Sequence, residues 1–321
     1  MNDLLKELRN SRSGCFIGSY YSGCFGYADD LLFLCPSRSG LQDMLNISEK
    51  YAHEHSISFS TDINPDKSKT KGMIFSKKKT DLSRYEKVKL GGNSLPWVPT
   101  SKYLGNRLTD QIDGLSQDVM EKRAKYVERN CELLQEFSFA HPEFKCKVNH
   151  IYNSSFTGSV LWDLTSENVT KVINSWSRSI KHMWNLPLNT HRYLIEPLGG
   201  KHLKTMLYSR YTKFVQSIQS GIKDAPIYLL ELIKHNTNTI TGRNVKKILY
   251  EIDETDISKV NLSKINKQIK FCEIPENEKW RINLIKELTN VKLNNLHIQF
   301  DNNGELTNEN IDDIIYSIAA N

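Results

Sequence analysis

The feature that most constrains this fold is a change of sequence pattern near residue 108. Before it, short apolar and aromatic runs are broken by glycine, which is typical of strands and turns. After it, apolar residues recur at helical spacing among many charges. The sequence therefore predicts an α+β fold, with a mixed part at residues 1–110, a helical part at 111–250 and an acidic C-terminal region at 251–321.

Within the mixed part, helices are predicted at residues 3–10 and from Ser39, a candidate N-cap, to His53–Ser56. An alternating run at Ile57 and Phe59 predicts a strand. Further elements are a turn at Asn64–Asp66, a strand at Met73–Phe75, a hairpin over Val88–Val98 and a strand at Tyr103–Gly105.

In the helical part, periodicity predicts helices over 115–136, 144–161, 166–184, 199–220 and 226–270. Pro187 and Pro197 are expected in connections, because proline cannot donate a helical hydrogen bond. Trp162, Trp176 and Trp184 are expected to anchor the core of this part, since large aromatic side chains bury the most apolar surface.

Charge is distributed unevenly along the chain. Residues 251–321 hold 13 acidic and 8 basic side chains, a net charge of −5, and the whole chain carries +6, so residues 1–250 carry +11. An excess of positive charge suits a polyanionic partner such as nucleic acid.

The cellular compartment is predicted from the sequence signals that are missing. No continuous apolar stretch reaches the ~20 residues of a membrane span, so no membrane partner is expected. The first nine residues resemble an amphipathic helix rather than a secretory signal. The six cysteines have no CxxC or zinc spacing, so reduced thiols are expected. An intracellular protein of the cytoplasm, the nucleus or both is predicted.

The acidic pair Asp29–Asp30 is the sharpest local feature of the chain. It lies between the apolar runs Cys24–Tyr27 and Leu31–Leu34, a setting that predicts a hairpin with both carboxylates at its tip. Adjacent like charges repel, and a divalent cation such as Mg²⁺ would offset that repulsion. A solvated Asp–Asp turn is the alternative, because aspartate favours turns.

Residues Tyr27-Ala28-Asp29-Asp30-Leu31-Leu32-Phe33-Leu34 resemble the YADD box, motif C of reverse transcriptases. Asn64-Pro65-Asp66-Lys67-Ser68-Lys69-Thr70-Lys71-Gly72-Met73-Ile74-Phe75 resembles motif D, which follows after one helix and one strand. Leu95–Val98 and Lys102–Gly105 are similar to the primer-grip region. Two later segments, Phe137–Pro142 and Thr190–Leu198, resemble parts of LINE-like (non-LTR retrotransposon) elements. The resemblance covers residues 1 to about 230.

This resemblance implies a partial reverse-transcriptase palm followed by a helical thumb, and RNA-directed DNA synthesis by two-metal nucleotidyl transfer. It implies that Asp29, and secondarily Asp30, bind two Mg²⁺ ions. Lys67 or Lys69 would protonate the leaving pyrophosphate, although a solvated basic loop is the simpler interpretation of these lysines.

The implied partners are an RNA template, a DNA primer and deoxynucleoside triphosphates. The residues implied to contact nucleic acid are Tyr27, Trp97, Lys102, Tyr103 and Gly105. For Trp97, a place in the core is an equally good interpretation.

Two parts of the family pattern have no counterpart here. No segment before Asp29 resembles motif A, which bears another aspartate, and neither the glycine-rich motif B nor the fingers are recognisable. We therefore expect the chain to be an incomplete enzyme that binds nucleic acid without polymerising. The alternative function is that of a non-catalytic nucleic-acid-binding remnant.

Overall fold

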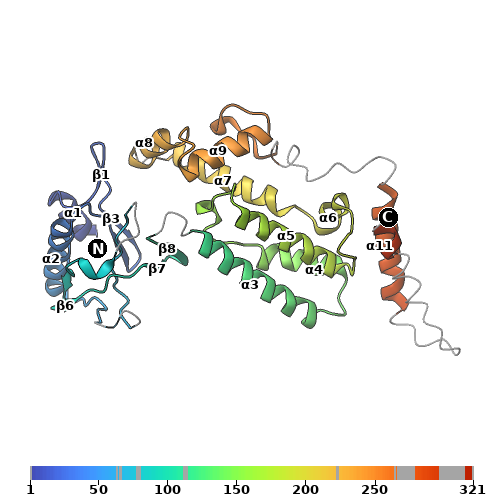
Figure 1. Cartoon of the computed structure of the whole chain (residues 1–321), viewed down its shortest axis with the longest axis horizontal. Helices are drawn as coiled ribbons and strands as arrows, with labels where there is room; N and C mark the ends of the chain where they lie inside the picture. The colour runs from blue at the N-terminus through green and yellow to red at the C-terminus, as the bar shows by residue number, and fades with distance from the viewer. Residues whose placement is uncertain are drawn as a thin grey trace. The chain divides into compact units, whose positions relative to one another are not determined.

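The computed structural model describes residues 2–62, 64, 67–76, 81–110, 115–221, 224–263, 265, 279–295 and 315–319. The chain forms two compact units. The first contains Met1–Leu115 and Ser217–Asn236, and the second contains Ser116–Gln216 and Thr237–Asn321 (Figure 1). The division thus falls just after the predicted boundary at residue 110. The return of Ser217–Asn236 to the first unit was not indicated by the sequence.

Within its described residues, the first unit is built from small hairpins and three α-helices. The helices are α1 (Asn2–Asn10), α2 (Arg38–Glu54) and α8 (Asp224–Ile233), with a short 3-10 helix at Leu82–Arg84. Four separate antiparallel hairpins are β1 (Phe16–Ile17) with β2 (Tyr20–Tyr21), β3 (Cys24–Tyr27) with β4 (Asp30–Phe33), β5 (Lys89–Leu90) with β6 (Asn93–Ser94), and β7 (Thr100–Tyr103) with β8 (Asn106–Thr109).

Two apolar clusters hold this unit together. In the first, Leu4 and Leu8 of α1 are 1% and 0% exposed and pack with Met44 and Tyr51 of α2. Their spacing of four residues places both leucines on one face of α1, as the predicted helix requires. The second cluster joins Leu45 of α2 to the β5–β6 hairpin through Val88, Leu90 and Leu95.

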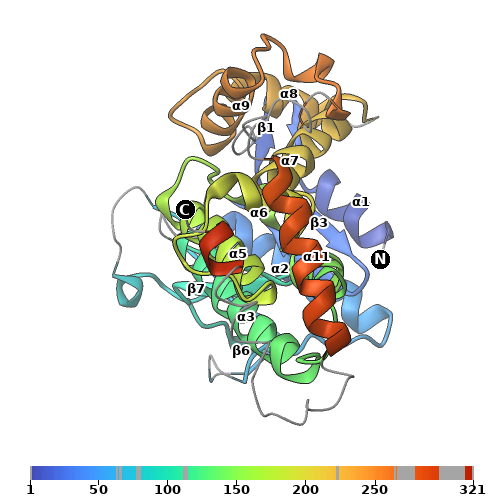
Figure 2. The ribbon, with the colours of Figure 1, turned by 90° about the vertical axis from the view of Figure 1, so that its right-hand side faces the viewer.

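The second unit is helical. Its elements are α3 (Leu115–Glu136), α4 (Pro142–Val148), a π-helix (Asn149–Asn153), a 3-10 helix (Ser159–Leu161), α5 (Glu167–Met183), α6 (Arg192–Gly199), α7 (Leu203–Gln219), α9 (Ile240–Glu251), a 3-10 helix (Ile257–Lys259) and α11 (Lys279–Asn295). Helices α4, α5 and α6 pack together (Figure 1). Helix α11 packs on α6, and both are labelled in Figure 2.

The three tryptophans form the centre of the second unit, as predicted. Trp162, Trp176 and Trp184 are 0%, 1% and 2% exposed. The indole N–H of Trp162 donates to Asp118 at 3.0 Å, and that of Trp184 donates to the Leu198 carbonyl at 2.9 Å. Their polar atoms are thereby satisfied, which burial of an indole ring requires.

Several predicted boundaries in the mixed part were wrong. The N-cap of α2 is Ser37, whose hydroxyl accepts from Gly40 N at 3.2 Å, rather than Ser39. No strand forms at Ile57–Phe59, because Ile57 N donates to Ala52 O at 2.8 Å and so closes the end of α2. Met73–Phe75 is not a strand either, since pairing here is limited to one bridge between Gly72 and Trp97.

The predicted strand at Tyr103–Gly105 is instead the tip of the β7–β8 hairpin. Leu104 and Gly105 have φ values of 47° and 76°, the left-handed conformation of a two-residue hairpin turn. Gly91 and Gly92 form an equivalent left-handed turn between β5 and β6, with φ values of 61° and 75°. The hairpin predicted over Val88–Val98 is therefore confirmed, with strands shorter than expected.

Two predicted helices are interrupted, and one proline that was predicted in a connection lies inside a helix. The segment 144–161 is broken after the π-helix, where Phe156 and Gly158 have φ values of 37° and 79°. The segment 226–270 is divided at Thr239, which caps α9 through its hydroxyl. Pro197 lies inside α6, two residues before that helix ends, where its missing N–H costs this short helix one backbone hydrogen bond.

Candidate active site

The acidic pair lies at the tip of a β-hairpin, as predicted. Strands β3 and β4 pair antiparallel with Cys24 opposite Phe33 and Tyr27 opposite Asp30. Ala28 and Asp29 form the two-residue turn, and Ala28 has a φ of 53°. A left-handed residue suits such a turn because its twist matches that of the flanking strands.

The two ends of this hairpin differ in burial. At its base, Cys24, Leu31 and Phe33 pack against the cluster formed by α1 and α2. At its tip, Asp29 and Asp30 are exposed and Tyr27 is 65% exposed. The fold therefore fixes the strands and leaves the carboxylates open to solvent and ligands.

Neither carboxylate is neutralised within the described part of the chain. The side chains of Asp29 and Asp30 make no hydrogen bond or ion pair with any described residue, and no described group of three or more His, Cys, Asp or Glu surrounds them. Their oxygens are the donor type that Mg²⁺ accepts, and water and phosphate usually complete its octahedron. The pair therefore fits a divalent cation that takes its remaining ligands from outside the protein.

Tyr103, on the β7–β8 hairpin, interacts electrostatically with Asp30. Burial is the main cause that raises the pKa of Tyr103, and the negative charge of Asp30 raises it further. The structure thus brings together a predicted nucleic-acid contact and a predicted metal ligand from separate hairpins. Lys102 and Gly105 are exposed beside Tyr103, near the same hairpin tip.

The motif D lysines are exposed on either side of a buried serine. Lys67 and Lys69 flank Ser68, which is 2% exposed and donates to Thr70 O at 2.6 Å. Within the described residues, no ion pair or hydrogen bond joins either lysine to Asp29 or Asp30. Pro65 and Asp66, the tip of the predicted turn, lie outside the described residues. The role of these lysines as a general acid stays a prediction.

Trp97 is engaged in the core of the first unit. A Cβ placed on Gly72 would meet the indole ring at 2.4 Å, so this ring lies directly against the Gly72 backbone. The indole N–H donates to Glu86 O at 3.3 Å, and the ring packs on the second apolar cluster. These contacts account for Trp97 as a packing residue, which favours the core interpretation.

Sequence reasoning missed the packing of α8 on the first hairpin. Tyr228 of α8 lies over Gly18, where an added Cβ would be 3.3 Å from the ring, and beside Tyr20 at 6.1 Å between ring centroids. Gly18 has a φ of 60°. A glycine in a turn gave no indication of this distant partner, because local sequence shows only the turn.

The described cysteines, which are Cys15, Cys24, Cys35, Cys131 and Cys146, are all free thiols. Cys272 lies outside the described residues. None of the described helices has the length and apolar character needed to cross a membrane.

Comparison of the chain with protein-family models, with curated proteins and with solved structures found no significant match.

Proposed function

We propose that this chain carries the metal-binding hairpin of a reverse-transcriptase-type nucleotidyl transferase, with Asp29 and Asp30 holding Mg²⁺ at a DNA primer terminus paired to an RNA template. One observation carries the proposal. Two adjacent carboxylates without described partners project from a hairpin tip whose base is fixed in an apolar core. Maintaining this repulsion is unfavourable unless a cation offsets it.

The chemistry is the transfer of a deoxynucleotide to the primer. The primer 3′-hydroxyl passes its proton to a solvent water molecule, its oxygen bonds to the α-phosphorus of a deoxynucleoside triphosphate, and the bond to the leaving pyrophosphate breaks. Mg²⁺ would supply charge stabilisation for the attacking and leaving oxygens. Lys67 or Lys69 is proposed to return a proton to the pyrophosphate.

The tyrosines near the tip provide the contacts to nucleic acid. The Tyr27 ring is 65% exposed and can stack on a base or sugar at the primer end. Tyrosine is protonated at neutral pH and the pKa of Tyr103 is raised further, so its hydroxyl can donate a hydrogen bond to a phosphate. Lys102 adds an exposed positive charge beside it.

A second candidate function is nucleic-acid binding without chemistry. The charge of +11 on residues 1–250 favours it. In this function the same surface would bind a duplex in a strongly salt-dependent manner.

The metal site is tested by replacing Mg²⁺ with Fe²⁺ in the presence of ascorbate, which cleaves the backbone close to the bound ion. We expect cleavage near residue 29 and near residue 103, because Asp30 and Tyr103 interact. Mg²⁺ should compete with this cleavage, and Asp29→Asn should abolish it. Asp43→Asn, which changes an exposed carboxylate on α2, is the matched control and should cleave normally. Uncut protein, or cleavage unchanged in Asp29→Asn, would refute the site.

Primer extension on an RNA template separates the two candidate functions. Extension that falls by at least about 100-fold in Asp29→Asn and persists in Asp43→Asn shows that the chain carries out the whole reaction. Absence of extension, together with salt-sensitive duplex binding that Asp29→Asn leaves intact, supports the second function.

A further inference from the structure

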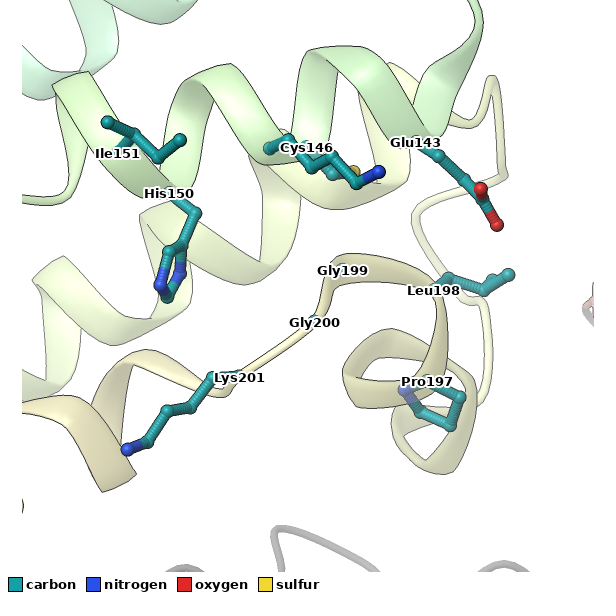
Figure 3. A pocket seen from close by; sticks show the side chains of 10 residues that line it. Glu143, Cys146, His150, Ile151, Pro197, Leu198, Gly199, Gly200 and Lys201 are labelled. Carbon is teal, nitrogen blue, oxygen red and sulfur yellow. The ribbon is translucent and has the colours of Figure 1, made fainter.

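A cavity of about 390 Å³ lies in the second unit, separate in sequence from the acidic hairpin (Figure 3). One wall is a single face of α4 and the π-helix, formed by Glu143, Cys146, Lys147, His150 and Ile151. The spacing of these residues follows the turns of a helix, so their side chains share one face. The opposite wall is the C-terminal end of α6 together with the start of its connection to α7, formed by Pro197, Leu198, Gly199, Gly200 and Lys201.

The connection has a conformation that requires glycine. Gly200 has φ 80° and ψ −151°, a region that other residues scarcely populate, and an added Cβ there would have no neighbour within 4 Å. Gly199 instead lies against Ile180, where an added Cβ would come within 2.7 Å. The backbone of this wall therefore packs tightly against α5 at Gly199 and faces open space at Gly200.

The other wall contains a π-helix, Asn149–Asn153, which follows directly after α4. Such segments are rare and frequently occur at functional sites. His150 and Ile151 belong to it and line the cavity. In Figure 3, His150 points from this wall toward the end of the cavity that bears Lys201, whereas Glu143 lies at the far end.

Positive charge gathers at the His150 end. His150 and Lys201 line this end of the cavity, where Arg210 of α7 acts electrostatically on both and Lys213 of α7 acts on Lys201. Burial first, and then the charges of Arg210 and Lys201, lower the pKa of His150. Burial, Lys213 and Arg210 likewise lower the pKa of Lys201. These effects show that the cations lie close enough to repel one another.

Among the described lining residues, no carboxylate lies at the His150 end of the cavity. Glu143 is the one acidic residue among the lining residues, and its carboxylate pairs with Lys286 of α11 at 2.9 Å. Arg210 donates to the backbone carbonyls of Ser154 and Ser155, which fixes its position without neutralising its charge. An anionic ligand would relieve the repulsion.

We propose that this cavity binds a nucleotide through its phosphate, with Lys201 and His150 contacting the phosphate and Ile151, Pro197 and Leu198 contacting the nucleoside. The volume is within the range of small-molecule sites, and its combination of apolar walls with a few convergent polar groups is typical of them. The nucleotide is either free or the 5′-phosphorylated end of a strand. The site does not depend on Asp29 or Asp30.

Fluorescence anisotropy of the full chain tests the proposal with a labelled adenosine monophosphate. Lys201→Gln should weaken binding by about tenfold, the loss of one charge-assisted contact. The matched control is Lys125→Gln, which removes the same charge from an exposed site on α3 outside the cavity, and binding should change less than about twofold. Equal effects of the two substitutions, or no binding at all by either free nucleotide or strand end, would overturn the proposal.

The source of the phosphate is distinguished by two short oligonucleotides of identical sequence. A 5′-phosphorylated strand that binds more tightly than its 5′-hydroxyl counterpart, and that adenosine monophosphate displaces, identifies a strand end. Binding of adenosine monophosphate without discrimination between the strands identifies a free nucleotide. Both outcomes support the site, provided that Lys201→Gln weakens the binding in each case.

The imidazole of His150 gives an independent readout by NMR titration with inorganic phosphate. The charged groups around it are Lys147 and Glu143 on its own wall, Lys201 on the facing wall and Arg210 on α7. A bound phosphate adds negative charge and should raise the pKa of His150 toward its ordinary value. An unchanged pKa at saturating phosphate would contradict the proposed contact.

Discussion

The two units of this chain bury their apolar surface in different ways. In the first, strands of two to four residues form four isolated hairpins around two small clusters. In the second, helices surround three fully buried tryptophans. Isolated hairpins are marginal without packing. The first unit therefore exposes turn residues on short, supported strands, whereas the second encloses polar groups in a continuous core.

The difference extends to polar groups. In the second unit, the buried amide of Asn244 accepts from Leu164 N and donates to Trp162 O, both at 2.8 Å. Asp118, 4% exposed, accepts from the Trp162 indole and pairs with Lys122 at 2.9 Å. In the first unit, Asp29 and Asp30 are exposed and have no such described partners. Asp118 and Asn244 thus stabilise the second unit from inside, while Asp29 and Asp30 of the first lie open to ligands.

Truncating one tryptophan in each unit should reveal the largest contrast. Trp162→Ala removes a fully buried side chain and should lower the free energy of unfolding by about 3–5 kcal/mol. Trp97→Ala removes a half-buried ring and should cost about 1–2 kcal/mol. Urea denaturation followed by circular dichroism measures both changes. Equal losses would show that the cores of the two units are equally important.

Acid should destabilise the second unit through His202. Burial, and then Lys204, lower the pKa of His202 from 6.5 to about 4, so the folded state keeps this ring neutral. The unfolded state takes up the proton first, and stability is lost as the pH falls from 6.5 toward 4, by up to about 3 kcal/mol. Hydrogen exchange measured by mass spectrometry against pH would localise the loss.

The control for this prediction is His202→Asn. The Nδ1 atom of His202 accepts from Lys204 N at 3.1 Å, and an asparagine oxygen can accept the same hydrogen bond at the start of α7. This variant should lose much of the pH dependence. An unchanged pH dependence in the variant would contradict the role of His202.

The smallest expected effect concerns a hairpin turn of the first unit. Gly91→Ala places a Cβ at a φ of 61° and should cost about 1–2 kcal/mol, although nearby space is open, with Thr61 Oγ1 at 4.0 Å. Ser94→Ala in the adjoining strand β6 is a control without this strain. Thermal unfolding measures the difference, and a loss no greater than that of Ser94→Ala would show that the turn tolerates a side chain.

Local sequence predicted those elements whose signals lie within a few residues. The helix at 115–136, the acidic hairpin and the buried tryptophans were recognisable because periodicity, turn residues and side-chain size are local properties. The predicted strands at Ile57–Phe59 and Met73–Phe75 were wrong because a strand exists only with a partner. The backbone donor of Ile57 was instead taken by α2, and Gly72 makes a single bridge.

The order of residues along the chain was enough to indicate the change from hairpins to helices, the carboxylate pair at a turn, and the positive charge of residues 1–250. Three-dimensional packing was needed to show that Tyr103 lies near Asp30, that α8 packs on the first hairpin, and that Lys201 shares a cavity with His150. These pairs are separated by 51 or more positions. Periodicity and turn chemistry report on neighbours within a few residues, so packing alone establishes such contacts.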